Sequence, residues 1–107
     1  MVYKVIKSNC KGIIQMEKEL LFITVIGQDR KGIVAKISNY LFENEINIED
    51  ISQKIIGTYF VMMMLVDISG STKAIDEVRL RLEETGKDLG VQVQIQHENI
   101  FKMMHRV

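Results

Sequence analysis

The sequence lacks a pair of cysteines and any long run of apolar residues. It contains one cysteine, Cys10, among 107 residues, so no disulfide can form within the chain. No stretch resembles a secretory leader or is long enough to cross a membrane. A chain of this length buries roughly two thirds of the surface that its unfolded form exposes, so its core needs neither a disulfide nor a metal. We therefore expect a cytoplasmic protein that folds as one domain.

An excess of charge of either sign is also missing. Fourteen basic residues balance fourteen acidic ones, which argues against a general electrostatic attraction to nucleic acid or to a membrane surface. RNA binding through a sheet requires exposed aromatic residues among basic ones, and the apolar stretch of residues 59–68 contains no Lys or Arg. We expect neither nucleic acid nor a membrane among the partners.

Signatures of catalysis are absent as well. The sequence contains no catalytic triad, P-loop or Rossmann fingerprint. An acylphosphatase would need a glycine-rich loop that holds an arginine at a helix N-terminus, and Arg30 lies outside such a motif. The adjacent carboxylates Glu83 and Glu84 point about 100° apart on a helix, which suits solvated side chains better than a catalytic pair. We predict that the protein is not an enzyme and has no catalytic residue.

Metal-ligand spacing is missing too, although two features could suggest a metal. The consecutive residues Met62–Met64 could attract a soft ion, but successive residues of a strand point in opposite directions, which favours packing against two surfaces. His97 and His105 have no Cys, Asp or Glu at a recognised ligand spacing. We expect no metal site and no cofactor.

The feature around which the chain is organised is an apolar strand that leads through a short connector into a helix. Leu20–Ile26 is rich in β-branched and aromatic residues, which predicts a buried strand. From Ile33 onward the apolar residues recur at helical spacing. The connector of residues 27–32 therefore ends at a helix N-terminus, where unpaired N–H groups and the positive end of the helix dipole favour an anion.

Two glycines and an aspartate of this connector suit a small ligand. Gly27 and Gly32 can adopt backbone angles closed to other residues and let a ligand approach the main chain. Asp29 can meet a ligand ammonium while the helix N-terminus meets a carboxylate, and the two groups together describe an amino acid. The alternative is that Asp29 only stabilises the turn and Gly32 only eases entry into the helix.

Three further strands are predicted after the first helix, and they cover residues 47–56, 59–68 and 91–96. Gly57 and Thr58 turn the chain between the second and third strands. The third strand is apolar on both faces, so the face away from the helices needs a cover, which is a second chain, the C-terminal segment or both.

A second helix is predicted before the last strand. Ile75, Val78, Leu82 and Leu89 give it one apolar face. Its N-cap is expected at Ser71 or Thr72. Gly86 permits a close approach, and Gly90 can close the helix in left-handed geometry.

Two segments resemble the ACT domain. They are Thr24–Ser38, which reads TVIGQDRKGIVAKIS, and Asn44–Gln53, which reads NEINIEDISQ. The chain looks most like the small stand-alone ACT proteins of unknown function. It is more distantly similar to the ACT domains of the glycine-cleavage repressor and of formyltetrahydrofolate deformylase. The resemblance covers the chain from about residue 17 to its C-terminus, although Lys31 occupies a position that is often proline.

The resemblance implies an α+β, ferredoxin-like fold with the order βαββαβ. Right-handed crossovers then give an antiparallel four-stranded sheet of order 2-3-1-4, with two helices on one face. It also implies a non-catalytic regulatory module that binds a small molecule, usually an amino acid, at an interface between two such domains. The ligand-binding candidates carried over to this chain are Gly27, Asp29, Gly32, Ile33, Asn47 and Ile48.

Association is expected because the second and fourth strands are sheet edges with modest charge. The predicted assembly is a homodimer or a tetramer, with a regulated protein as a possible further partner. The alternative is a purely structural homo-oligomer, or a protein-interaction adaptor, that binds no ligand.

The two ends of the chain fall outside the predicted domain of residues 17–97. Residues 1–16 form an N-terminal segment in which residues 1–15 look appended, because we expect Met16 to be the natural start. N-terminal mass spectrometry of native protein would decide this. The alternative is an extra edge strand at Tyr3–Ile6. Residues 98–107 place apolar side chains at helical spacing and predict a short C-terminal helix that docks on the sheet or on a partner.

Overall fold

The computed structural model describes residues 18–99 of the chain. The predictions for residues 1–16 and, apart from Glu98 and Asn99, for residues 98–107 lie outside this described part. Its elements are β1 (Leu20–Gln28), α1 (Ile33–Glu43), β2 (Asn47–Ile56), β3 (Tyr59–Asp67), α2 (Ile75–Leu89) and β4 (Val91–His97).

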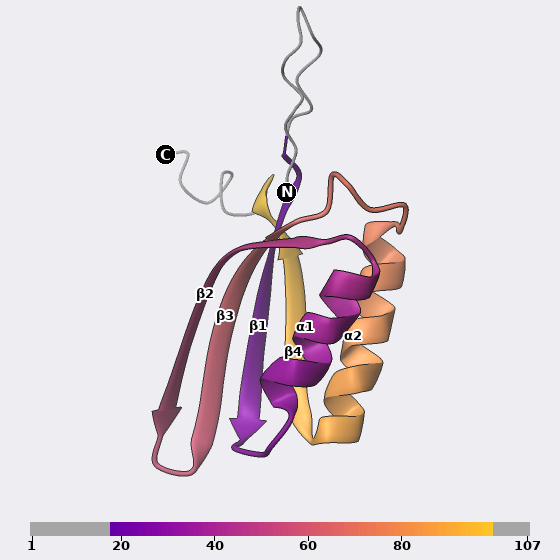
Figure 1. Cartoon of the computed structure of the whole chain (residues 1–107). Coiled ribbons are helices and arrows are strands. Elements are labelled where there is room, and N and C mark those ends of the chain that lie inside the picture. Colours follow the sequence, from indigo (N-terminus) through magenta and orange to yellow (C-terminus); the bar gives the residue numbers. More distant parts are fainter. Residues whose placement is uncertain (1–17, 100–107) are drawn as a thin grey trace, which may run out of the picture.

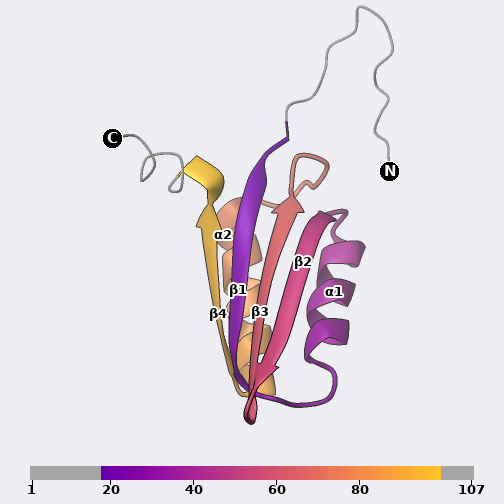
Figure 2. The same cartoon turned by 90° about the vertical axis from the view of Figure 1, so that its left-hand side faces the viewer.

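The four strands form one antiparallel sheet in the order β2-β3-β1-β4. The two helices pack on one face of this sheet (Figure 1), and in Figure 2 the strands lie in front of α2. The predicted ferredoxin-like βαββαβ fold and its strand order are therefore confirmed.

The core lies between the sheet and the helices. β1 and β3 occupy the centre of the sheet and send alternate side chains into this layer, so that Ile23, Met62 and Met64 are fully buried. The helices contribute Ile37 and Leu82, which are also fully buried. This alternation confirms that Met62–Met64 point in alternating directions, since Met63 between them is 48% exposed.

A glycine allows β4 and α2 to lie close together. A Cβ placed on Gly86 would lie 2.6 Å from Val93 Cγ2 and 2.9 Å from the backbone oxygen of Val91. Real Cβ atoms essentially never approach other atoms this closely, so only glycine lets α2 lie this near to the strand. The close approach predicted for Gly86 is confirmed, and Gly90 closes α2 with a left-handed φ of 76°.

Apart from shifts of one residue at the ends of β3 and β4, two local details differ from the expectations. β1 continues through Gly27 to Gln28 instead of ending at Ile26, because Gly27 pairs with Phe60 on one side and Val91 on the other. The N-cap of α2 is Ala74. The Ser71 hydroxyl oxygen instead accepts a hydrogen bond from the backbone N–H of Lys73 at 3.1 Å, within the loop that precedes the helix.

Candidate functional site

The loop between β1 and α1 is exposed and is tied to the neighbouring hairpin. The backbone N–H of Asp29 donates to the carbonyl oxygen of Thr58 at 3.0 Å, while the Asp29 side chain remains exposed. Thr58 belongs to the turn that joins β2 to β3. The loop is therefore anchored toward the β2 side of the sheet, with the Asp29 carboxylate on the surface.

The N-terminus of α1 has an open surface. Gly32 is its N-cap, with a left-handed φ of 89°, and no side chain caps the helix. The first turn carries no acidic residue, and a Cβ on Gly32 would meet nothing within 4 Å. Glycine is required at this position by its backbone angle. The positive end of the helix is thus left without a negative side chain in its own first turn.

The other two candidates of this region have structural roles. A Cβ on Gly27 would lie 2.7 Å from Val91 Cγ1 and 2.9 Å from Val91 Cα, so this glycine is needed for the pairing of β1 with β4. Ile33 is 1% exposed and belongs to the core. Only its backbone N–H, at the start of α1, could take part in ligand binding.

Arg30 lies on the other side of the loop. A Cβ built on Gly90 would be 3.7 Å from the guanidinium carbon of Arg30, which places this cation at the C-terminal end of α2. A positive side chain there is favoured by the negative end of the helix dipole. Arg30 therefore stabilises the end of α2 and leaves Asp29 as the outward acidic group of the loop.

Asn47 and Ile48 lie at the opposite end of the sheet. Asn47 pairs with Asp67, and Asp67 also pairs with Leu20 at the start of β1. The loop follows the far end of β1, so about eight residues of strand, or roughly 27 Å, separate the two groups of candidates. Within one chain the structure brings Gly27, Asp29, Gly32 and Ile33 together and places Asn47 and Ile48 elsewhere.

A polar network surrounds Asn47. Its side-chain amide donates to the Glu49 carboxylate at 2.8 Å, and the Lys18 ammonium approaches the other oxygen of Glu49 at 2.7 Å. The hydrogen bond from Lys18 lowers the pKa of Glu49, and the same contact raises the pKa of Lys18. Ile48 is half-buried and packs against the core.

Asp67, which sequence reasoning missed, organises this end of the molecule. It is 7% exposed, and its Oδ1 atom accepts hydrogen bonds from the backbone N–H groups of Glu19 and Ser69, both at 3.0 Å. It thereby ties the start of β1 to the loop after β3. An acidic residue that closes an otherwise uncharged strand was the signal that could have identified it.

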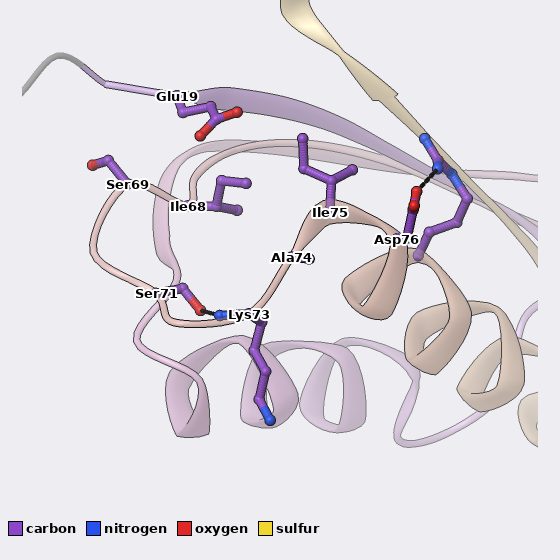
Figure 3. Close-up of a pocket in the computed structure, with 9 residues that line it drawn as sticks. Glu19, Ile68, Ser69, Ser71, Lys73, Ala74, Ile75 and Asp76 are labelled. Atoms are coloured by element: carbon purple, nitrogen blue, oxygen red, sulfur yellow. Dashed lines mark hydrogen bonds and ion pairs between the residues drawn. The ribbon is translucent and has the colours of Figure 1, made fainter.

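A hollow of about 600 Å³ lies between the start of β1 and the start of α2, near these hydrogen bonds (Figure 3). Ile68 and Ile75 line its middle, and the Lys73 side chain points away from them. The charged groups at its wall all have partners, and Lys73 contacts Glu77 at 3.3 Å. Arg79 contacts Asp76 at 3.3 Å, and Glu19 contacts His97 at 3.3 Å. None of the predicted ligand-binding residues lines this hollow.

Two further properties concern the described part of the chain. Among residues 18–99, no three His, Cys, Asp or Glu side chains come together in a way that could hold a metal ion. No helix within this range has the length and apolar character needed to span a membrane.

Comparisons with known proteins identify the domain. The ACT domain family matches residues 19–96. A UPF0237 protein of Methanocaldococcus jannaschii is 55% identical over 85 residues, which cover 79% of this chain and 94% of that protein. An ACT domain protein from Streptococcus pneumoniae has 37% identity and a TM-score of 0.71, covering 80% of this chain and 97% of that one.

Two larger proteins share the fold over part of their length. A protein described as a glycine cleavage system transcriptional repressor matches with a TM-score of 0.66 and 26% identity, over 75% of this chain and 46% of that one. A formyltetrahydrofolate deformylase from Pseudomonas syringae has a TM-score of 0.71 at 20% identity, over 77% of this chain and 28% of that one. The latter likeness concerns the fold alone.

The fold and the family match define a small ferredoxin-like domain of a class whose members are generally regulatory ligand-binding modules. The chain belongs to the ACT domain family and, within it, to the UPF0237 group of small proteins.

Proposed function

We propose that the protein is a non-catalytic ligand sensor that binds an amino acid, or a similar small molecule, between two copies of the chain. The ligand carboxylate would bind the N–H groups at the start of α1. The ligand ammonium would bind the Asp29 carboxylate. This proposal covers the sequence-derived candidates in the loop, with Gly27 and Ile33 acting through the backbone only.

The observation that carries the proposal is the separation of the two candidate groups along the sheet. β2 is an edge strand, and its side chains Ile51 and Ile55 are 40% and 58% exposed. If β2 pairs antiparallel with β2 of a second copy, the two strands run in opposite directions. Asn47 of one copy then lies at the end of the sheet that carries the Asp29 loop of the other.

The anchoring of the loop supports the same arrangement. The hydrogen bond from Asp29 to Thr58 holds the loop toward the β2–β3 turn, which is the side that faces the second copy. Ligand binding would then strengthen the contact between two copies, and a change in association is the signal that a regulated protein partner could detect.

The first test is thermal unfolding of the protein against the twenty amino acids, with its mass measured by light scattering. A ligand at a hundred times its dissociation constant stabilises the native form by about 2.7 kcal/mol. For a domain of this size the midpoint of unfolding rises by several degrees or more. If no amino acid raises it and the mass is that of an oligomer, the structural homo-oligomer without ligand is the better explanation.

The second test is Asp29→Ala. We expect this variant to keep its mass and to lose most of the stabilisation by the responding amino acid, because the ammonium loses its acceptor. Asp88→Ala is the matched control, since Asp88 is also exposed and lies near the end of α2. Unchanged affinity in the Asp29 variant would remove Asp29 from the site.

A further inference from the structure

The face of the sheet opposite the helices has an ordered pattern of side chains, which we call the open face. Residues that pair across antiparallel strands point to the same side of a sheet. The register places four residues in each cross-strand row of this face. From β4 to β2 the three rows are Gln96-Phe22-Leu65-Asp50, Gln94-Thr24-Met63-Ser52 and Gln92-Ile26-Val61-Lys54.

The central strands make the open face apolar. Ile26 and Met63 are 49% and 48% exposed, and Tyr59, in the next row, is 54% exposed. In the three rows, β1 and β3 contribute no charged side chain, β4 contributes glutamines, and β2 contributes one acidic and one basic residue. The charge on this face therefore sums to zero, so two copies of it do not repel each other.

The open face is large enough for a specific contact. Four strands about 4.8 Å apart and about eight residues long cover roughly 500 Å². Two such faces in contact bury about 1,000 Å² in total, which is the lower limit for a specific protein interface.

The positions of the two charges select one geometry. Asp50 and Lys54 lie two residues on either side of Ser52. Consider a two-fold axis that crosses the strands along the Gln94-Thr24-Met63-Ser52 row. It places Asp50 of each copy opposite Lys54 of the other, which gives two ion pairs. The same axis places Leu65 opposite Val61. An axis parallel to the strands would instead place both charges against glutamines of β4.

We propose that the open face binds the open face of a second copy about this crossing axis. The contact is separate from the edge pairing of β2, because it uses the broad face of the sheet and its centre is Met63 on β3. Where both contacts form, the assembly is a tetramer. Where only the face forms its contact, the assembly is a dimer.

Cross-linking tests the face contact directly. Met63→Cys is prepared with Cys10→Ser, which leaves one thiol per chain. In the face-to-face pair the two thiols lie between sheets about 10 Å apart, whereas edge pairing through β2 separates them by three strand spacings, about 14 Å, and points them to the same side. A short bismaleimide should therefore join the chains of the face-paired form.

The control is Leu80→Cys in the same background, because Leu80 is 55% exposed on α2, away from the sheet. We expect the Met63 variant to cross-link at least tenfold faster than this control. Equal rates would overturn the proposal. Protection of the Met63 thiol from small maleimides at every dilution would also overturn it, since a segment of the same chain would then cover the face.

A charge-pairing experiment on β4 gives an independent readout. Gln94 lies on the proposed axis and therefore faces Gln94 of the second copy. Gln94→Lys or Gln94→Glu would place two like charges opposite each other across the contact. We expect each variant alone to raise the dissociation constant of the face contact about tenfold. In an equal mixture the introduced lysine faces the introduced glutamate, so the dissociation constant should return to the wild-type value. Sedimentation that is the same for each variant and for the mixture would contradict the proposed axis. The Asp29 tests do not depend on these outcomes.

Discussion

β2 and β4 are the two edge strands of the same sheet, yet the helix layer covers only one of them. In β4 the helix-side residues Val91, Val93 and Ile95 are 5–7% exposed, and glutamines alternate with them on the other side. In β2 every residue from Asp50 to Ile56 is exposed. The register places Ile51 and Ile55 level with Met64 and Phe60 on the helix side.

The difference arises from how closely each helix can approach its strand. Gly86 lets α2 approach β4 closely and bury that edge, whereas α1 leaves the helix side of β2 exposed from Asp50 to Ile56. Two exposed isoleucines on an edge strand invite pairing with another chain. The comparison indicates that β4 is covered within residues 18–99 of one chain, and that β2 is the edge available for association.

The largest expected effect comes from placing the same charge on the helix side of each edge. Ile95→Asp puts a carboxylate into a site that is 5% exposed and should lower the free energy of unfolding by about 4 kcal/mol or more. Ile55→Asp, at a site that is 58% exposed, should change it by no more than about 0.5 kcal/mol in dilute protein.

Urea unfolding of both variants, at a concentration where the wild-type chain is monomeric, measures this contrast. At higher concentration the mass of the assembly formed by Ile55→Asp should be lower than that of the wild-type assembly, because the charge lies at the proposed edge contact. An equally large loss of stability in the two variants would show that the monomer itself covers β2.

An intermediate effect is expected at the glycine that lets α2 cover β4. Gly86→Ala ordinarily stabilises a helix by about 1 kcal/mol. Here the new Cβ meets Val93 and the backbone of Val91, so we expect a net destabilisation of about 1–3 kcal/mol. Thermal unfolding measures it, with Lys87→Ala as a control on the exposed side of α2. A stabilised Gly86 variant would mean that β4 is less tightly covered than the geometry indicates.

The smallest effect concerns the polar contact that holds the start of β2. The pKa of Glu49 is lowered by Lys18, so this contact contributes stability above the unfolded pKa of Glu49, and the contribution is lost as the pH falls through the lower folded value. Glu49→Gln should therefore make stability less dependent on pH on the acid side. Unfolding curves between about pH 3 and 7 check it, and parallel profiles for variant and wild type would contradict it.

Much of the fold could be predicted because its signals are local. Alternation in residues 91–96, the apolar run at Leu20–Ile26 and the helical spacing from Ile33 each reflect a short stretch of chain that buries one face. The N-cap of α2 could not be assigned in this way, because Ser71 and Thr72 both suit a cap, whereas the helix is capped by Ala74 without a side-chain hydrogen bond.

The candidate site was harder to predict because proximity in sequence does not set position in the sheet. Gly27 looked suited to a ligand, and only the tertiary structure shows that the close approach of Val91 also requires a glycine there. Asp67 was overlooked, since its role depends on backbone groups of Glu19 and of the loop after β3. A bulge at Glu49 also shifts the register of β2. The residues after it point to the opposite sides from those that a regular strand would give.

The amino-acid sequence by itself determined the order of strands and helices, the family and the left-handed glycine turns, because each depends on residue type within a short window. The tertiary structure decided which edge is covered, which glycines are required by packing and where the candidate residues lie relative to one another. Those properties depend on side-chain volumes and backbone groups that meet across the sheet, and no local pattern records them.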